Sequence, residues 1–262
     1  MKKIFYCFLS LLVLLIASCT NQTTVINKVI DQKVDIEENI TIKDLENQLC
    51  NVIEIAEQAV VGIVATFDNA LLKTESYGSG VVIKKDSNDY YIITNRHVVV
   101  KQDNACTNIK LYLGSINLYL QCEIIAYDKK VDIALLKVTT EVLLSVARLG
   151  DSSLLKKGRF AVAIGSPYSL ESYFNTVTVG HVSSPSRLIN EDNYFYKELT
   201  NEYIQIDTTI NVGCSGGGLF NLEGELIGIN TWKLYDSKEN IDNMNFAVPI
   251  NLVKDLFVHY LG

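Results

Sequence analysis

Short runs of β-branched and aromatic residues, separated by turn residues, follow one another from Val60 to Pro249 and constrain the fold more than any other feature. Many short strands at close spacing predict an all-β domain, a sandwich or a barrel, and argue against alternating strand–helix repeats. The clearest runs are VVGIVAT, GSGVVIKK, YYIITN, IKLYL, LYLQCEIIAY, DIALLKV, RFAVAIG, TVTVGHVSS, YIQIDTTI, GLFN, ELIGINTW and MNFAVP.

An amphipathic segment lies on each side of this strand-rich region. Residues 41–59 carry apolar side chains at helical spacing, and Thr41 followed by Asp44 predicts a capped helix start. Residues 250–260 follow Pro249 and predict a short C-terminal helix. The apolar positions are Ile42, Leu45, Leu49, Val52, Ile53, Ala56 and Val60 in the first segment, and Leu252, Val253, Leu256 and Phe257 in the second.

The N-terminus has the pattern of an export signal. Lys2 and Lys3 precede an apolar run over residues 4–16, which is too short to span a bilayer comfortably. Residues 16–19, Ile-Ala-Ser-Cys, resemble a bacterial lipobox, in which the cysteine becomes the lipidated first residue. The alternative is a plain signal peptide that happens to contain Cys19.

We therefore expect a signal peptide at 1–18, a lipid-anchored polar tether at 19–40 and a folded domain at 41–262. The folded domain would lie outside the cytoplasmic membrane, held to the bacterial cell envelope by lipid on Cys19. The formal net charge of −7 argues against nucleic acid as a partner.

Four cysteines remain in the expected mature domain: Cys50, Cys106, Cys122 and Cys214. There is no CxxC motif and no His/Cys cluster at metal-ligand spacing, so we expect neither a metal site nor a cofactor. Cys106 and Cys122 flank two strand-like runs around a Gly-Ser-Ile-Asn turn. A disulfide across this hairpin is possible outside the cytosol, and its formation depends on the register of the two strands.

Three residues stand in settings that suit nucleophilic catalysis. His97 ends the run YYIITNRH, Asp132 precedes the apolar run IALLKV, and Ser215 lies within GCSGGG. Each alone is more often structural than catalytic. Together they supply a nucleophile, a base and a carboxylate that fixes the imidazole tautomer, in the chain order used by chymotrypsin-like barrels. The glycines around Ser215 let the N–H groups of Gly213 and Ser215 face one point as an oxyanion hole.

The chain resembles the protease domain of the HtrA/Deg branch of trypsin-like serine peptidases from about Val60 to Pro249. The matching segments are YGSGVVI, IITNRHVV, YDKKVDIALLKV, LGDSSLLKKGRFAVAIGSP, TVTVGHVSS, IQIDTTIN, GCSGGGLFN, GELIGINT and NFAVP. The resemblance implies a double β-barrel with lobes at about 60–145 and 146–250. It also implies that His97 is the general base, Asp132 its orienting carboxylate and Ser215 the nucleophile.

The resemblance further implies that residues 165–178 and 232–245 form the loops that set active and inactive states. Three departures stand out. Cys214 and Gly218 occupy places where the family usually has asparagine and proline, and Val212 stands where it commonly has another proline. Losing prolines loosens the turn, so the oxyanion hole is expected to depend more on bound substrate. No peptide-binding PDZ domain follows in this sequence.

These features predict a serine endopeptidase that cuts unfolded or extended polypeptides, which barrel proteases bind as an added strand. Two alternatives remain: a catalytically silent peptide-binding lipoprotein, and a secreted serine peptidase of narrow specificity. The predicted partners are polypeptide substrates, a membrane through the N-terminal lipid, and further copies of the chain. The substrate pocket is assigned to Thr209, Ile210, Val212 and Phe246, which suit an uncharged aliphatic side chain.

Other candidates for these roles are weaker. Cys214 adjoins the nucleophile but behaves as a small hydrophobe when buried. His181 and His259 have no carboxylate pattern beside them in the sequence and are expected to be structural or on the surface. Asp128 is the next carboxylate to consider if Asp132 does not orient the base.

Overall fold

The computed structural model describes residues 41–69, 72–167, 170–188, 202–233 and 243–261. The predicted signal peptide, Cys19 and the tether lie outside the described residues, as do parts of the two predicted loops. The chain divides into two units, residues 1–47 and 48–262. Within the described residues, every helix is too short or too polar to span a bilayer.

The helix α2 (Ile42–Ala56) begins with the predicted cap. The Thr41 N–H donates to Asp44 Oδ2 at 2.9 Å, and the Asp44 N–H donates to Thr41 Oγ1 at 3.2 Å. This reciprocal pair satisfies two N–H groups that the first helical turn leaves without partners. The helix ends before the predicted residue 59, because a 3₁₀ turn, η1 (Glu57–Ala59), leads into the first strand.

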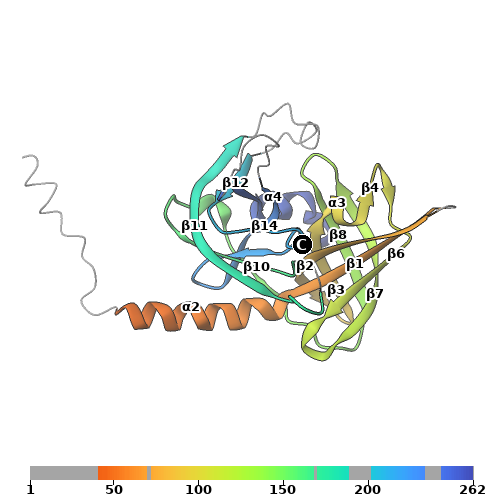
Figure 1. Ribbon diagram of the computed structural model, residues 1–262, viewed down its shortest axis with the longest axis horizontal. Coiled ribbons are helices and arrows are strands. Elements are labelled where there is room, and N and C mark those ends of the chain that lie inside the picture. The colour runs from red at the N-terminus through yellow and green to blue at the C-terminus, as the bar shows by residue number, and fades with distance from the viewer. Residues whose placement is uncertain (1–40, 70–71, 168–169, 189–201, 234–242, 262) are drawn as a thin grey trace, which may run out of the picture. The chain divides into compact units, whose positions relative to one another are not determined.

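Six antiparallel strands close the first barrel in the order β1-β2-β3-β8-β7-β6 (Figure 1). The strands are β1 (Val60–Asn69), β2 (Leu72–Asp86), β3 (Asp89–Asn95), β6 (Asn108–Leu113), β7 (Leu118–Asp128) and β8 (Ile133–Thr139). A one-turn helix, α3 (Arg96–Val99), and a small ribbon, β4 (Val100–Lys101) with β5 (Asn104–Ala105), follow β3. Closure pairs every strand on both sides, so this barrel has no open edge.

The predicted Gly-Ser-Ile-Asn turn joins β6 and β7 as η2 (Gly114–Ile116), and Asn117 takes a left-handed φ of 49°. The register places Ile109 opposite Cys122, while Cys106 precedes β6. Both thiols are free, so the possible hairpin disulfide is not formed in this structure. Burial raises the pKa of Cys106 to about 11 and that of Cys122 to about 12, which keeps both thiols protonated.

The second barrel has the strand order β13-β10-β11-β12-β15-β14 and is closed by pairing between β13 and β14. The strands are β10 (Phe160–Gly165), β11 (Thr176–Leu188), β12 (Glu202–Ile206), β13 (Gly218–Phe220), β14 (Glu225–Lys233) and β15 (Asn245–Pro249). The short β9 (Arg148–Leu149) adds to β14 in parallel, and the turn η3 (Ser152–Leu154) precedes β10. The predicted all-β double barrel with helices at both ends is confirmed.

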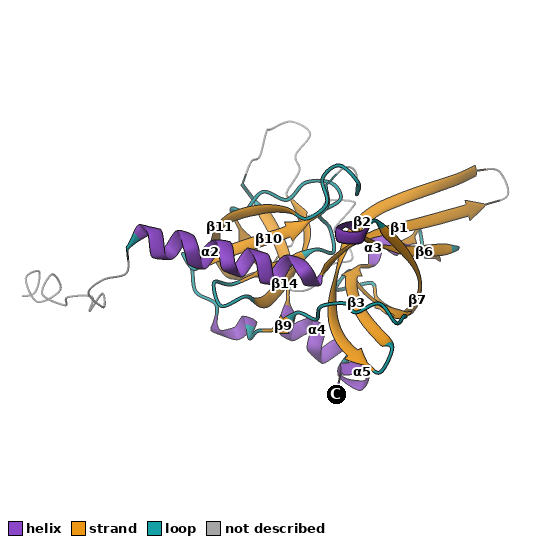
Figure 2. Ribbon diagram, turned by 90° about the horizontal axis from the view of Figure 1, so that it is seen from below, coloured by secondary structure: helices purple, strands orange, loops and turns teal. Residues whose placement is uncertain are grey.

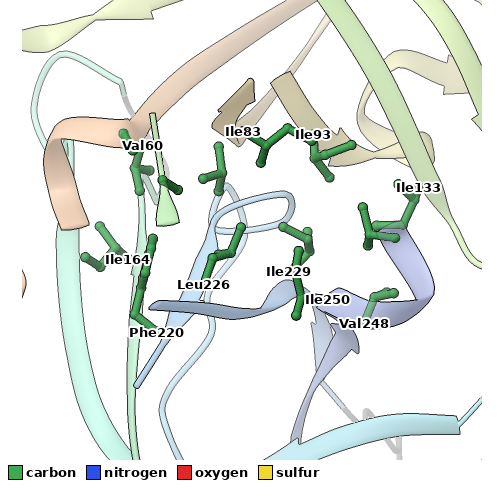
Figure 3. Packing of buried hydrophobic residues seen from close by; sticks show 14 of the residues in the cluster. Val60, Ile83, Ile93, Ile133, Ile164, Phe220, Leu226, Ile229, Val248 and Ile250 are labelled. Atoms are coloured by element: carbon green, nitrogen blue, oxygen red, sulfur yellow. The ribbon is translucent and has the colours of Figure 1, made fainter. Parts of the chain in front are cut away.

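A buried apolar cluster joins the two barrels (Figure 3). The first barrel contributes side chains from β1, β2, β3 and β8, and the second contributes side chains from β10, β13, β14, β15 and the C-terminal helix. The labelled members are Val60, Ile83, Ile93, Ile133, Ile164, Phe220, Leu226, Ile229, Val248 and Ile250. Separate clusters fill the interiors of the first and second barrels. Burial of this shared surface holds the facing edges of the barrels at a fixed separation.

The C-terminal segment folds as two short helices, α4 (Ile250–Leu256) and α5 (Val258–Leu261), where the sequence predicted one. The break is at Phe257, whose side chain is buried in the cluster between the barrels. Lys84 of β2 donates to the carbonyl of Tyr260 at 2.8 Å, which ties α5 to the first barrel. Figure 2 shows α5 at the C-terminal end of the chain. The free energy gained by burying the Phe257 side chain therefore outweighs that of continuing the helix through this residue.

Candidate active site

His97 and Asp132 are brought together by the pairing of β3 with β8. Asn95 at the end of β3 lies opposite Ile133 at the start of β8, so the residues just beyond each strand are neighbours. His97 Nδ1 lies 2.6 Å from Asp132 Oδ2, and the His97 backbone N–H donates to Asp132 Oδ1 at 2.9 Å. Both oxygens of the Asp132 carboxylate thus bind His97, one through the ring and one through the backbone N–H, which fixes the position and the tautomer of the ring.

The backbone around Asp132 is itself specialised. Its φ of 60° is left-handed, which is uncommon for a residue with a side chain. Its carbonyl accepts from the Arg96 N–H and from Asn95 Nδ2, both at 3.0 Å. These bonds hold the strained backbone in the conformation that turns the carboxylate toward His97.

The electrostatics of His97 suit a general base. Desolvation of the ring lowers its pKa, but attraction to the Asp132 carboxylate and the hydrogen bond between them outweigh that effect. The pKa of His97 is therefore raised above its ordinary value of 6.5. A base whose pKa lies near the working pH can both take and return a proton.

This shift predicts a pH profile. Below its pKa, His97 is protonated and cannot accept the proton of a serine hydroxyl, so kcat/KM falls as the pH drops. Because the pKa is raised, the fall begins at a higher pH than an ordinary histidine would give. Hydrolysis of an uncharged peptide ester measured against pH checks this, and an acid limb centred below 6.5 would contradict it.

Ser215 follows a tight turn that requires glycine. The Cys214 N–H donates to the Asn211 carbonyl at 2.9 Å, and Gly213, the third residue of this turn, has a φ of 98°. A positive φ at that place is the mark of a type II turn, which favours glycine. Gly216 has a φ of 86°, and a Cβ there would lie 2.1 Å from the Ser79 carbonyl oxygen.

The N–H groups of Gly213 and Ser215 are free to donate to a ligand. Within the described part of the chain, neither N–H has an acceptor. Gly213 is buried, and a buried N–H group without a partner costs free energy. The pair therefore suits an oxyanion, which would accept from both.

The hydroxyl of Ser215 is bound to Thr231 in this structure. Ser215 Oγ donates to the Thr231 carbonyl at 2.9 Å, and Thr231 Oγ1 donates to Asp132 Oδ2 at 3.3 Å. The serine is thus linked to the His97–Asp132 pair through Thr231, and no hydrogen bond joins it to His97 directly. Rotation of the Ser215 side chain would have to bring Oγ to the imidazole, as is common when no substrate is bound.

Sequence reasoning missed the contact between Thr231 and Asp132. The signal was present in the run IGINTW. Asn230 and Thr231 are polar side chains in an otherwise apolar run, and both are buried. Buried polar side chains need partners, so two in succession indicate a specific contact.

The four predicted pocket residues lie in different surroundings. Ile210 belongs to the interior cluster of the second barrel. Phe246 belongs to the cluster between the barrels and stacks on Trp232 with ring centroids 4.2 Å apart. Thr209 and Val212 face solvent, and Val212 is 79% exposed. The assignment of these residues to a pocket stays a prediction.

The rival candidates have other contacts. Burial raises the pKa of the Cys214 thiol, which leaves it a poor nucleophile. Asp128 caps the turn before Asp132 by accepting from the Val131 N–H at 2.8 Å. His181 is exposed, and its Nδ1 lies 3.5 Å from Asp207 Oδ2, a carboxylate that is distant in the sequence. Asp207 directly follows β12 and lies 26 residues after His181 in the chain, so a local sequence pattern cannot show that the two are neighbours.

No group of three or more His, Cys, Asp or Glu side chains that could hold a metal ion occurs among the residues described. The site brings together a carboxylate-bound imidazole, a serine after a glycine turn, and two N–H groups that have no acceptor among the described residues. This set can transfer an acyl group to the serine.

The comparisons with known proteins agree with this geometry. Residues 78–229, more than half of the chain, match the trypsin-like peptidase domain. A probable periplasmic serine endoprotease, DegP-like, of Hahella chejuensis is 40% identical over 184 residues, covering 70% of this chain and 35% of the relative. A serine protease Do-like HtrA of Lactococcus lactis subsp. cremoris is 30% identical over 255 residues, covering 92% of this chain and 61% of the relative.

A solved structure of the HtrA-type protease AlgW with a tripeptide is also similar. Its TM-score is 0.66 at 26% identity, and the match covers 81% of this chain and 63% of that chain. The chain thus spans less than two thirds of the length of each of these relatives. The matched domain includes His97, Asp132 and Ser215. The chain belongs to the trypsin-like peptidase family.

Proposed function

We propose that this protein is a serine endopeptidase in which Ser215 is the nucleophile, His97 the general base and Asp132 the carboxylate that orients it. The observation that carries the proposal is the 2.6 Å contact between His97 Nδ1 and Asp132 Oδ2 beside the paired ends of β3 and β8. Thr231 links this carboxylate to Ser215 in the second barrel. The similarity to HtrA and DegP-like serine proteases supports it.

The reaction follows from these positions. His97 takes the hydroxyl proton as Ser215 Oγ attacks the carbonyl carbon of the substrate. The N–H groups of Gly213 and Ser215 donate to the oxyanion that forms. The imidazolium then gives its proton to the leaving amine, and an acyl group remains on Ser215. Water, deprotonated by His97, then attacks the acyl carbon, the bond from that carbon to Ser215 Oγ breaks, and the imidazolium returns its proton to Oγ as the acid leaves.

The proposed substrate is an extended polypeptide. Trp232 and Lys233 of β14 pair with β15 on one side, Thr231 lies at a register shift between the two strands, and β13 pairs with β14 only as far as Ile229. An extended segment could therefore add to β14 beside Ser215, and its N–H could donate to the Thr231 carbonyl. That N–H would compete with Ser215 Oγ for the same acceptor and release the hydroxyl toward His97.

The uncharged side chains assigned to the pocket predict the cleavage sites. Thr209, which we assign to the pocket floor, offers no carboxylate for a Lys or Arg side chain, whose burial without a counter-charge costs several kcal/mol. The residues assigned to the pocket also include no basic side chain that would favour cleavage after Asp or Glu. We expect cleavage after Val, Ala, Leu, Ile or Thr. The preference among these residues should be broad, because one methylene more or less in an apolar pocket changes the binding free energy by only about 1–3 kcal/mol.

A digest of an unfolded protein, with cleavage sites mapped by mass spectrometry, measures this preference. A parallel digest with Ser215→Ala in place of the wild-type enzyme identifies the cuts made by contaminating proteases, which are then subtracted. Dominant cleavage after Lys, Arg, Asp or Glu would contradict the pocket, and a single narrow preference would favour the narrow-specificity alternative.

We further propose that the protein works at the outer face of a bacterial membrane, anchored through Cys19, and that copies of the chain can associate. Cys19→Ala is expected to leave the protein soluble or unprocessed, because it removes the lipid attachment site. Since one acyl chain gives only marginal anchoring, we expect at least two on the mature N-terminus. Fractionation and intact-mass analysis check this, with Cys50→Ala as the control that keeps the anchor. An unmodified mature N-terminus would refute anchoring.

A second candidate function is peptide binding without cleavage, by a lipoprotein that has lost activity. The hydrogen bond from Ser215 Oγ to the Thr231 carbonyl favours it, because it holds the nucleophile off His97. A fluorophosphonate probe separates the two functions, since it labels an activated serine. Labelling of the wild type and not of Ser215→Ala supports the peptidase, and absence of labelling in both supports the silent protein.

A further inference from the structure

We infer that Ser79 is a positioning residue for the oxyanion hole and that its hydroxyl holds Gly213 in place from the adjoining barrel. Ser79 lies in β2 of the first barrel and is fully buried. The inference rests on the proposed function, because it assumes that Ser215 and Gly213 serve acyl transfer.

Ser79 binds the carbonyl of each residue whose N–H forms the hole. Its hydroxyl donates to the Gly213 carbonyl at 2.8 Å. Its backbone N–H donates to the Ser215 carbonyl at 2.9 Å. One residue of the first barrel therefore fixes two points of the turn in the second barrel, and with them the separation of the two N–H groups.

The direction of the Ser79 hydroxyl is determined by a third contact. Ser79 Oγ accepts from the Ser166 N–H at 2.9 Å, so its own proton is directed at Gly213. Ser166 is also buried and directly follows β10. The hydroxyl thus has one donor and one acceptor, both backbone groups of the second barrel.

The Gly213 carbonyl depends on this hydroxyl. Among the described residues, no other group donates to it. A buried carbonyl that loses its donor must find another or admit water, and the peptide that carries it then moves. Gly213 has no side chain to resist that movement, and Val212 stands where proline would have stiffened the turn. Loss of the hydroxyl therefore displaces the Gly213 N–H from the oxyanion.

Ser79→Ala tests this with kinetics and two ligands. Removal of a whole oxyanion donor costs about 10²–10³ in kcat, so a displaced donor should cost about 10-fold or more. KM should change little, because the hole acts on the transition state. A peptide aldehyde, which forms a tetrahedral adduct with Ser215, should bind weaker by the same factor. The corresponding peptide acid, which forms no adduct, should bind as it does to the wild type.

Ser184→Ala is the matched control. Its hydroxyl is also buried and donates to a backbone carbonyl, that of Ser186, at 2.8 Å, within β11 and away from the nucleophile turn. It should lose thermal stability like Ser79→Ala and keep kcat. If Ser79→Ala melts below the assay temperature, Ser79→Cys, of similar volume but a weaker donor, replaces it with the same expected result.

The outcomes are separable. Wild-type kcat in either folded Ser79 variant, or equal loss of affinity for the aldehyde and the acid, would overturn the positioning role and leave the peptidase intact. A wild type that hydrolyses nothing, or whose activity survives Ser215→Ala, would overturn the proposed function instead. A fall in kcat together with weakened aldehyde binding alone supports Ser79 as proposed.

Discussion

Replacement of Ser215 by alanine is expected to lower kcat by about 10⁶-fold while leaving the fold and peptide binding unchanged. In the proposed mechanism this hydroxyl is the nucleophile, and a triad that has lost its nucleophile acts only through the remaining hole and binding contacts. Among the described residues, the Ser215 hydroxyl makes a single, partly buried hydrogen bond, to the Thr231 carbonyl, so the melting temperature should stay near that of the wild type.

The measurement is steady-state hydrolysis of a peptide ester by highly purified protein, with Ser115→Ala as the control. Ser115 is exposed in the η2 turn of the first barrel and should tolerate the change. Retained turnover in Ser215→Ala, at a rate that scales with its concentration, would contradict the assignment of the nucleophile.

Asp132→Asn is expected to lower kcat by about 10⁴-fold. The amide keeps the shape of the side chain, but its NH₂ group facing His97 Nδ1 favours the tautomer that cannot take the proton of Ser215. The change also removes the attraction that raises the pKa of His97, so the acid limb of the remaining activity should move to lower pH.

Asp128→Asn is the matched control for this variant. Asp128 lies in the same turn but bonds to the Val131 N–H, so its replacement should cost some stability and leave the pH profile in place. If Asp128→Asn lost more activity than Asp132→Asn, Asp128 would be the residue that orients the base.

The sequence predicted the strands and the triad segments because both depend on local patterns. Runs such as YYIITN and IALLKV show which segments form strands, and glycines beside Ser215 show a turn. The capped start at Thr41 was equally local and is present in the structure.

Contacts between distant segments could not be predicted in this way. The hydroxyl of Ser79 reaches the carbonyl of Gly213, 134 residues along the chain, and His181 meets Asp207 across two strands. The bond of Ser215 Oγ to Thr231 depends on a side-chain rotamer, which leaves no trace in a residue pattern. The break at Phe257 depends on burial between the barrels, which becomes visible only when both are placed.

The division of the site between the two barrels also bears on when activity begins. His97 and Asp132 belong to the first barrel, while Gly213, Ser215 and Thr231 belong to the second. A chain in which one barrel alone has folded holds no complete set of reacting groups. Domains fold as units during and after synthesis, so hydrolysis starts only when the barrels have docked. Docking thus delays the first cut until the chain's own strands are no longer exposed as substrates.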